Sequence, residues 1–349
     1  MRNYLLATAG IVGMAFAASV AQAASYIPVV PPTGSVSTTI FGINDSNVVA
    51  GSFNDSAGVE HGFYGPPDGS NYTVFDFGGD ATGTEPRGIA NDGSITGIAK
   101  GSGFSIGEEF FRAPDGTINV IRNPYRIFDG VVQGLNDKDF FVGDFYGAKG
   151  VRVGYEGKDR QYRRRFKLPI DGVTSTNPRQ RNNHGWVTGS FNDSAGAQHG
   201  FIMKGDRADT LEVLDYPDAG AQYTVGEGIN DKGQVSGLWA DSAGNRHGFV
   251  LDTTTNTWTL IDGGDGSTFQ QVWGINSKGL IAVNTQQSSG YVSYIYCPLK
   301  QSECPNGGAE VKVHQIHVAS STFRNYDRHG RTGRHLPRAT AVKKMGNLP

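Results

Sequence analysis

Three histidines recur at equivalent places in this chain, and they are the first residues to suggest acid–base chemistry. His61, His199 and His247 each open the phrase His-Gly-Phe. A general acid or base must lie within hydrogen-bond reach of the group that it serves. Because the three histidines belong to different copies of a repeat, we expect them to be separated by the width of a structural unit. The pattern therefore favours a structural role, in which each imidazole ties a loop to its own unit.

Short loops rich in Asp and Ser precede these histidines, and they raise the question of calcium. They occupy residues 54–58, 192–196 and 241–244. A calcium loop brings several carboxylate or carbonyl oxygens to one ion. Each of these loops offers one Asp followed by Ser, which is a common turn composition. We therefore predict turns here, and the sequence gives no reason to expect a metal or a cofactor.

A different kind of candidate comes from positions at which the copies of the repeat disagree. Repeated positions report packing, so positions that escape the repeat are candidates for binding. The predicted ligand site consists of Arg87, Gln133, Arg179, Glu227 and Trp273. Their mixed charge and aromatic edge suit a polar ligand or a sugar. The alternative is that the charged members form ion pairs between neighbouring units and bind nothing.

These positions are defined by one phrase that returns six times, with Gly-Ile-Asn-Asp at residues 228–231 as its clearest copy. The second position of the phrase falls at residues 43, 89, 135, 181, 229 and 275, so the step is 46 residues except for one of 48. A period in this range indicates an array of identical supersecondary units. The candidate residues above all stand two positions before this point in the repeat.

One copy contains four short segments with the composition of strands. Residues 223–229, 234–239, 246–251 and 257–261 are rich in β-branched and aromatic residues, and Asn, Asp, Gly or Ser bound each of them. Four antiparallel strands repeated every 40–50 residues are typical of a β-propeller blade. We predict an all-β fold over residues 24–308, a six-bladed β-propeller of four-stranded antiparallel blades. The Gly before the recurring Ile would let innermost strands approach closely.

The two ends of the repeat array predict how the propeller closes. Residues 26–30 stand where a fourth strand would precede the first phrase, so we expect this N-terminal strand to complete the last blade. The rival for that place is the segment 310–318. Cys297 and Cys304 are the two cysteines of the chain. In an oxidising compartment we expect them to form a disulfide that staples the last blade.

The termini outside the array have their own compositions. Arg2, an apolar run over residues 5–20 and the small-x-small site 21–23 predict a signal peptide, residues 1–23, cleaved near Ala23. This places the mature protein outside the cytoplasm, secreted or periplasmic, without a transmembrane anchor. Residues 309–349 hold eight Lys or Arg against two acidic residues, which predicts a basic, disordered tail.

A second basic segment lies within the third repeat. Residues 158–167 contain six Lys or Arg. Such runs can bind polyanions, but Asp159 within the run and the predicted signal peptide argue against a dedicated nucleic-acid-binding role. We interpret the run as a solvated hairpin and expect no nucleic-acid partner.

The phrase Gly-Ile-Asn-Asp-x-Gly-x-Val-x-Gly, followed after a loop by His-Gly-Phe, resembles the HAF-type extracellular repeat of secreted bacterial proteins. The best copy is residues 228–237 with residues 247–249, and the copies together span about residues 41–296. The resemblance implies export and a propeller-like fold, but no reaction. The expected function is a monomeric binding or scaffold protein that recognises an extracellular polymer or glycan. The alternative is a hydrolase or lyase with its site in the mouth of the central channel, and the sequence leaves open whether the protein is an enzyme.

Overall fold

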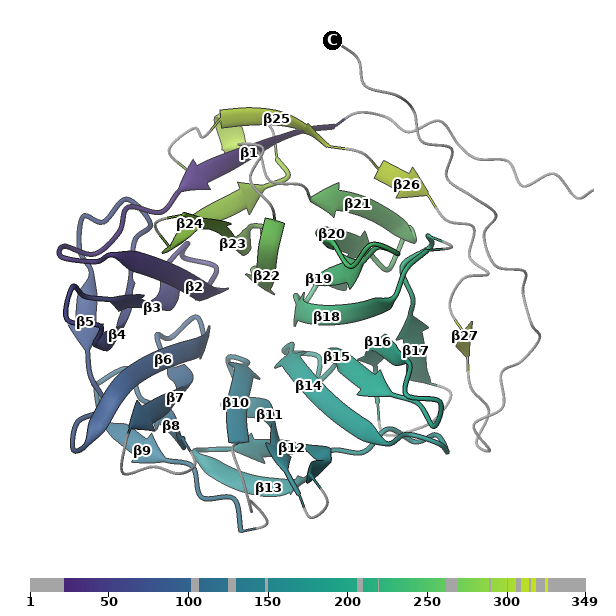
Figure 1. The fold of residues 1–349 in the computed structure, drawn as a ribbon, viewed down its shortest axis with the longest axis horizontal. Coiled ribbons are helices and arrows are strands. Elements are labelled where there is room, and N and C mark those ends of the chain that lie inside the picture. The colour runs from purple at the N-terminus through teal and green to yellow at the C-terminus, as the bar shows by residue number, and fades with distance from the viewer. Residues whose placement is uncertain are drawn as a thin grey trace, which may run out of the picture.

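The structure, a computed structural model, describes residues 22–101, 107–124, 130–147, 150–205, 210–218, 220–261, 269–288, 290–299, 301–305, 309–313, 315–317 and 324–325. These residues are all-β, and they form a β-propeller with four-stranded antiparallel blades set around a common axis (Figure 1). Residues 1–21 of the predicted signal peptide lie outside the described residues. Among the described residues, no helix is long and apolar enough to cross a membrane.

Four of the five sheets in the described residues contain one blade each. The third copy of the repeat forms β10 (Gly130–Leu135), β11 (Phe140–Tyr146), β12 (Arg152–Lys158) and β13 (Gln161–Arg165). The fourth copy forms β14 (Ser175–Arg181), β15 (Val187–Asn192), β16 (Gln198–Met203) and β17 (Leu211–Leu214). The fifth copy forms β18 (Tyr223–Ile229), β19 (Gln234–Ala240), β20 (Arg246–Asp252) and β21 (Thr257–Ile261). The last copy forms β22 (Phe269–Ile275), β23 (Ile281–Gln287) and β24 (Gly290–Cys297), followed by a short 3-10 helix, η3 (Gln301–Glu303).

The first two copies share one eight-stranded sheet, which differs from the six separate blades predicted from the repeat. The first copy supplies β2 (Ser37–Ile43), β3 (Val49–Asn54), β4 (Glu60–Gly65) and β5 (Thr73–Phe75). The second supplies β6 (Ala81–Ile89), β7 (Ile95–Gly101), β8 (Glu108–Arg112) and β9 (Ile118–Val120). A single parallel pairing, Glu60 with Gly83, joins β4 to β6. The first two copies therefore merge where the start of β6 touches β4.

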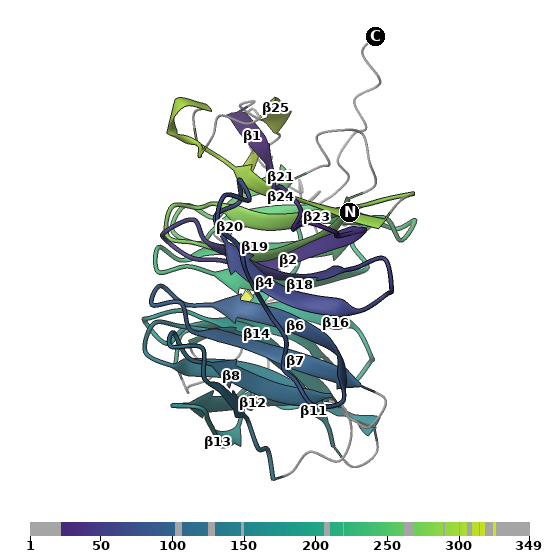
Figure 2. The same cartoon turned by 90° about the vertical axis from the view of Figure 1, so that its left-hand side faces the viewer.

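The N-terminal strand pairs with the last copy of the repeat, as the sequence predicts. This strand, β1 (Gln22–Pro28), runs antiparallel to β24 with Tyr26 opposite Tyr296. It begins four residues before the predicted segment 26–30. The rival segment also joins this sheet, because β25 (Ala309–Val313) pairs with the other edge of β1. Both views place β1 and β25 side by side next to β24 (Figures 1 and 2).

Parts of the predicted disordered tail are strands, which corrects that prediction for three segments. Besides β25, the strand β26 (Gln315–His317) pairs with β21, and β27 (Arg324–Asn325) pairs with β17. The C-terminal segment thus adds a strand to the outer edge of three successive blades. Backbone hydrogen bonding at an open edge does not depend on side-chain hydrophobicity, so the basic composition did not reveal these strands. The remaining residues of the predicted tail lie outside the described residues.

Close approach of the innermost strands explains the Gly of the repeated phrase. A Cβ on Gly88 would stand 3.0 Å from the Cα of Gly134 in the next copy. A Cβ on Gly274 would stand 3.1 Å from the carbonyl oxygen of Phe41 in the first copy. At such distances a side chain would require the neighbouring backbone to shift, so Gly allows the closest approach. The sequence-based prediction of crowding at this position is therefore confirmed.

The Asn of the phrase links the innermost strand to the next copy in five of the six copies, the second having Ala90 at this position. Its Oδ1 accepts hydrogen bonds from its own turn, as Asn182 does from the N–H groups of His184 and Trp186. Its Nδ2 donates to a carbonyl in the following copy. The acceptors are the carbonyls of Ala90 for Asn44, Asn182 for Asn136, Asn230 for Asn182, Asn276 for Asn230 and Asn44 for Asn276, at 2.9–3.2 Å. The last of these bonds joins the sixth copy to the first.

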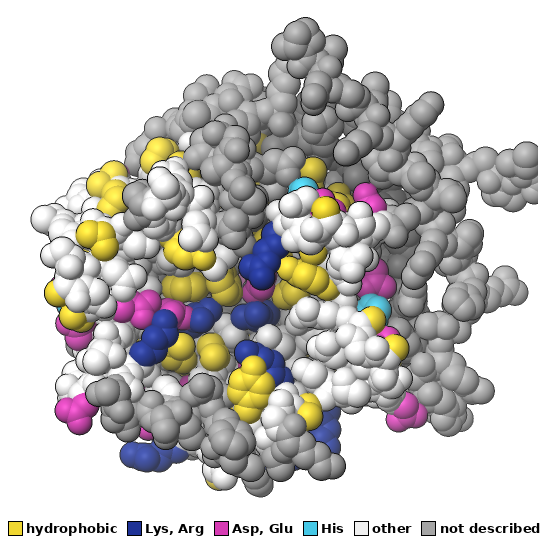
Figure 3. Space-filling view, viewed as in Figure 1, with side chains coloured by type: hydrophobic (Ala, Val, Ile, Leu, Met, Phe, Trp, Pro, Cys, Tyr) yellow, Lys and Arg dark blue, Asp and Glu magenta, His cyan; other side chains and the backbone are white. Residues whose placement is uncertain are grey.

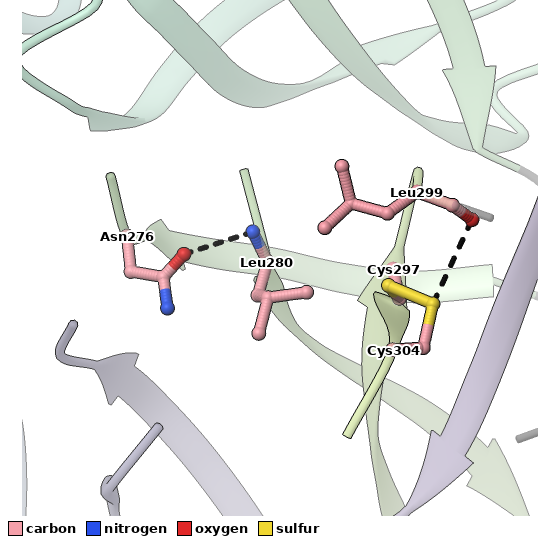
Figure 4. The surroundings of a disulfide bond; sticks show 5 residues. All are labelled: Asn276, Leu280, Cys297, Leu299 and Cys304. Carbon is pink, nitrogen blue, oxygen red and sulfur yellow. Dashed lines mark hydrogen bonds between the residues drawn. A yellow bond between two sulfur atoms is a disulfide. The ribbon is translucent and has the colours of Figure 1, made fainter. Parts of the chain in front are cut away.

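The hydrophobic core lies between neighbouring blades, and the predicted disulfide belongs to the part of the core that contains β1 and the last copy. In one such layer Tyr216 stacks on Trp239 with ring centroids 4.1 Å apart. Cys297 and Cys304 form the predicted disulfide (Figure 4). Both cysteines are buried in a cluster that includes Ile27 of β1. The staple therefore sits where the N-terminal strand meets the last copy of the repeat.

Candidate functional site

The five residues of the predicted ligand site meet around one cavity on the axis. Each lies on the innermost strand of its copy, two residues before the recurring second position of the phrase. The cavity is lined by Phe41, Arg87, Gln133, Arg179, Glu227 and Trp273, with Gly134, Gln180 and Gly274 between them. Its volume is about 10 Å³, which is room for about one water molecule. We call the six side chains from Phe41 to Trp273 the channel mouth. The structure thus brings together all five predicted residues, and it adds Phe41 from the first copy.

Two guanidinium groups pack against the aromatic rings of the channel mouth. Arg87 Cζ lies 4.6 Å from the ring centroid of Phe41 and 5.3 Å from that of Trp273. Arg179 Cζ lies 5.8 Å from the Trp273 centroid. The two rings themselves meet edge to face with centroids 5.0 Å apart. Cation–π contacts of this kind contribute on the order of 0.5–2 kcal/mol, depending on solvation, so the rings hold both cations on the axis.

Arg87 is paired within its own strand. Its guanidinium contacts the carboxylate of Glu85, which also accepts a hydrogen bond from Lys100. Burial would raise the pKa of Glu85, but Arg87 and Lys100 outweigh it and hold that pKa below its ordinary value. Lys100 in turn contacts Glu60 at 3.0 Å. Glu85 therefore remains a carboxylate that fixes the position of Arg87.

Arg179 is paired across two blades, and this pair is less complete. Its Nε lies 3.3 Å from Oε2 of Glu227. Both atoms are nevertheless buried without an aligned hydrogen bond, so the contact is an ion pair without a directed N–H···O bond. Burial raises the pKa of Glu227, although Arg179, Arg87 and Arg246 oppose this shift. The ion-pair alternative considered for the sequence is thus realised in part, since Arg179 and Glu227 do approach each other between units.

A further buried carboxyl group stands beside the channel mouth. Asp144 is 1% exposed and contacts Arg152. Burial raises its pKa despite the opposing effect of Arg152 and Arg179 and a hydrogen bond from Gln133. Among the described residues, its Oδ1 is buried without a hydrogen-bond partner. The sequence reasoning missed Asp144, because it lies on β11, outside the innermost strands that were compared.

The surface around the axis is rich in cations. On the face shown in Figure 3, Lys and Arg side chains gather around the centre, with hydrophobic and acidic side chains between them. The loops that precede His61, His199 and His247 lie on the same face as the channel mouth, because each loop follows the strand that returns from the Asn turn. This face therefore carries most of the residues that the sequence singled out.

The three histidines belong to separate blades and tie loops to them, as predicted. His199 Nδ1 lies 2.7 Å from Asp215, and its Nε2 lies 3.4 Å from Asp193. His61 repeats this arrangement with carboxylates of its own blade. Burial would lower the pKa of His199, but the two carboxylates outweigh it and raise that pKa above its ordinary value.

The Asp of each neighbouring loop is engaged by its own turn. Oδ1 of Asp193 accepts hydrogen bonds from the N–H groups of Ala195 and Ala197, and Asp55 and Asp241 make the same pair of bonds in their loops. These are the predicted turns. Within the described residues, no group of three or more His, Cys, Asp or Glu side chains is arranged to hold a metal ion.

The opposite end of the axis carries a ring of side chains that the sequence reasoning missed. Its members follow the Asn position of the phrase and alternate between carboxylate and hydrogen-bond donor. In chain order they are Asp45, Asn91, Asp137, Asn183, Asp231 and Ser277. Asn183 Nδ2, for example, donates to Asp137 at 2.8 Å and to Asp231 at 2.9 Å. Ser277 donates to Asp45 at 2.9 Å, which again joins the last copy to the first. The alternation of residue types at this position was the available signal.

The basic segment of the third copy is a hairpin, as predicted. It is formed by β12 and β13, and its cations have acidic partners nearby. Arg164 contacts Glu156, and Arg163 lies 3.4 Å from Asp159. Arg163 is exposed. The hairpin is therefore a solvated edge of the third blade, remote in sequence from the channel mouth.

No protein-family model and no curated protein matches the chain. Similar solved structures include an Aleuria aurantia lectin in complex with Fucalpha1-6GlcNAc, at 11% identity over 83% of this chain and 100% of that one, with a TM-score of 0.47. TolB from Acinetobacter baumannii shares 14% identity over 66% of this chain and 61% of its own, with a TM-score of 0.46. Trypanosoma rangeli sialidase shares 10% identity over 79% and 57%, also with a TM-score of 0.46. At this level the likeness is one of fold, and it transfers no ligand or reaction to this chain.

Proposed function

We propose that this chain is an exported binding or scaffold protein with HAF-type repeats, whose six copies form a closed propeller and whose channel mouth binds an extracellular glycan. Export is supported by the leader composition of residues 1–23 and by the Cys297–Cys304 disulfide, which is typical of an oxidising compartment.

Closure into a ring of six is supported by bonds between the first and last copies. Asn276 donates to the carbonyl of Asn44, and Ser277 donates to Asp45. The eight-stranded sheet then counts as two blades, because a single parallel strand pairing, Glu60 with Gly83, makes its two halves one sheet among the described residues. Closure matters for function because it makes six divergent side chains converge on one axis.

Glycan binding rests on the composition of the channel mouth. Sugars present both polar hydroxyl groups and apolar C–H faces, so their sites combine charged hydrogen-bonding groups with aromatic rings. The channel mouth offers Trp273 and Phe41 beside Arg87, Arg179 and Glu227. Buried polar atoms without hydrogen-bond partners, such as Oε2 of Glu227, are candidates to contact a ligand. The cavity admits about one water, so the bulk of a glycan would lie over the mouth.

A binding screen with a matched variant tests this proposal. The mature chain 24–349 is screened against immobilised glycans and polysaccharides, together with Trp273→Leu, which keeps an apolar side chain but removes the ring. We expect binding by the parent chain and a loss of roughly tenfold or more in affinity for the variant, as for a central aromatic contact. The melting temperatures of both chains control for folding. Absence of binding by the parent, or equal binding by both folded chains, would count against the proposal.

A hydrolase or lyase at the same mouth is the second candidate function. The observation that favours it is the presence of two buried carboxyl groups, Glu227 and Asp144, whose pKa values are raised by burial. Carboxyl groups of this kind serve as general acids near neutral pH. Release of reducing ends or unsaturated products from a bound polysaccharide, abolished by Glu227→Gln, would establish this function in place of simple binding.

A further inference from the structure

At the channel mouth, the positively charged groups are more available to a ligand than the negatively charged groups. The cations at or beside it are Arg87, Lys100, Arg152, Arg179 and Arg246, and the acidic groups that face them are Glu60, Glu85, Asp144 and Glu227. Glu85, Asp144 and Glu227 are buried. Burial favours the neutral form of Asp144 and Glu227, whereas Arg87 and Lys100 keep Glu85 charged. Arginine guanidinium groups, by contrast, stay protonated even when they are buried. The balance at the mouth therefore tends toward positive charge.

Arg87 and Arg179, the two arginines on the axis, each have an N–H group that is available to donate a hydrogen bond. Nε of Arg87 and Nε of Arg179 are both buried without a hydrogen-bond partner among the described residues. Glu227, the counter-ion of Arg179, offers charge at 3.3 Å but no aligned acceptor. A guanidinium recognises a carboxylate through two parallel N–H···O bonds. An incoming carboxylate would supply the acceptor geometry that Glu227 does not.

The size of the cavity limits what can enter between these arginines. With a volume of about 10 Å³, which is room for about one water molecule, it excludes a sugar ring and admits only the tip of a protruding group, such as one carboxylate oxygen. Trp273 and Phe41 offer apolar surface beside the cations. A small free anion would leave that apolar surface uncovered. A sugar that carries a carboxylate would contact both the apolar surface and the cations.

From these contacts we infer that the channel mouth is selective for acidic sugars, with Arg87 and Arg179 binding the carboxylate of a uronic acid residue in an extracellular polysaccharide. This inference rests on the proposed glycan-binding function and assigns its ligand class. The carboxylate enters between the two guanidiniums, and the sugar ring lies over the mouth beside Trp273.

The test compares an acidic polymer with its neutral counterpart. Binding of polygalacturonate and of carboxyl-reduced polygalacturonate to the chain 24–349 is measured by titration calorimetry, with sodium acetate as a probe for a bare carboxylate. We expect the acidic polymer to bind at least tenfold more tightly than the reduced polymer, and acetate to compete weakly. Equal binding of both polymers, or binding of the neutral polymer alone, would overturn the inference while leaving glycan binding intact. If neither these polymers nor any glycan binds, the proposed function itself fails.

Variants locate the carboxylate site. Arg87→Gln and Arg179→Gln each remove one guanidinium. Arg179→Lys keeps the positive charge but removes the two parallel N–H donors of the guanidinium. Arg163→Gln is the matched control, because it removes an exposed cation from the hairpin of the third copy. We expect the mouth variants to weaken binding roughly tenfold or more and the control to leave it unchanged. A similar loss in all variants would mean non-specific charge attraction and would refute the site.

Protection from arginine-specific modification keeps the site testable if a variant does not fold. The parent chain is treated with phenylglyoxal with and without polygalacturonate, and modified arginines are identified by mass spectrometry. We expect the polymer to protect Arg87 and Arg179 but not Arg163. Protection of Arg163 in place of the mouth arginines would place the acidic-polymer site on the hairpin.

Discussion

At the scale of single residues, His199 shows how one side chain can hold a loop and respond to pH. Its ring lies against Phe191, with centroids 5.2 Å apart, while its two nitrogens face Asp193 and Asp215. The imidazole thus joins the β15–β16 loop to the segment that follows β17. A recurring His was sufficient to predict this role, because register in a repeat reports packing. The acidic partner Asp215, 16 residues away, was missed, although its surroundings recur in the chain. Val-Leu-Asp-Tyr at residues 213–216 matches Val-Phe-Asp-Phe at residues 74–77, where Asp76 pairs with His61.

This geometry predicts a pH-dependent contribution of His199 to stability. The folded pKa is raised above the ordinary value of 6.5, so the folded state binds the proton more tightly than the unfolded state. The stabilisation is complete below about pH 6.5 and is lost as the pH rises through the folded pKa. We expect His199→Gln to lower the free energy of unfolding by about 1–2 kcal/mol at pH 5.5 and by less at pH 8.5. Denaturant unfolding of both chains across this range measures the difference.

Asp215→Asn is the matched control for this effect. It removes the closer carboxylate but leaves the turn capped by Asp193. We expect it to flatten the pH dependence much as His199→Gln does. A difference between parent and His199→Gln that stays constant from pH 5.5 to 8.5 would contradict the ion-pair account and leave packing on Phe191 as the explanation.

The channel mouth extends the residue-scale comparison between sequence and structure. Its members could be predicted because they depart from the repeat on a strand whose neighbours obey it. Their partners could not, since the pairing of Arg87 within its strand and of Arg179 across blades depends on rotamers and burial. The binding role of these residues stays a proposal.

At the scale of elements, the repeat made the strands highly predictable. The expected strands of the fifth copy agree with β18 to β21 within one residue at each end. Because the same pattern occurs in six copies, the position of each short strand can be predicted with much less ambiguity than from a single copy. The added strands β25 to β27 have no such redundancy. Their pairing depends on which blade edges remain open, and that is a property of the assembled fold.

The turn after each innermost strand offers an element-scale prediction. Ala90 takes the place of Asn in the second copy, and Asp92 caps that turn by accepting from the N–H of Ser94. The side-chain link to the next copy is therefore missing at this position. We expect Ala90→Asn to supply it, through a bond to the carbonyl of Asn136, and to raise the free energy of unfolding by about 0.5–1.5 kcal/mol.

Asn182→Ala is the complementary change. It removes a bond to the carbonyl of Asn230 and two bonds to its own turn, and we expect it to cost about 1–3 kcal/mol. Urea unfolding of the parent and both variants gives the comparison. If Ala90→Asn destabilises the protein, the space beside Asn136 does not accept an amide, and the links are not interchangeable between copies.

At the scale of the whole molecule, the ring of alternating Asp and Asn or Ser side chains on the axis limits how many copies of the repeat can form a closed propeller. Asp occupies the first, third and fifth copies, and Asn or Ser occupies the others. Asp45 and Asp137 each accept side-chain hydrogen bonds from both neighbouring copies, as Asp137 does from Asn91 and Asn183, and Asp231 accepts one from Asn183. Such an alternation returns to its start without placing two carboxylates side by side only if the number of copies is even. The bond from Ser277 to Asp45 completes the pattern at the sixth copy.

The proposed ring also makes the N-terminal strand a decisive part of the molecule. Strand β1 pairs with β24 and buries Ala24, Tyr26 and Ile27, at 1%, 6% and 3% exposure. Ile27 packs between the first and last copies, and Ala24 and Tyr26 pack between the fifth and last copies. Burial of one large apolar side chain stabilises a fold by about 1.5–3 kcal/mol, out of a total of about 5–15 kcal/mol. A chain that starts at residue 29 should therefore lose much of its stability and expose the edge of β24.

Strand replacement tests this prediction directly. We expect the chain 29–349 to melt well below the chain 24–349, and a synthetic peptide of residues 24–30 to restore part of the lost melting temperature by adding back to the open edge. The chain 24–305 is the control, because it removes β25 to β27 but keeps β1 paired with β24. It should retain one cooperative transition, with a smaller loss. Equal melting of the chains 29–349 and 24–349 would show that the first and last copies hold together without β1, through direct contacts such as the bonds from Asn276, Ser277 and Asn284.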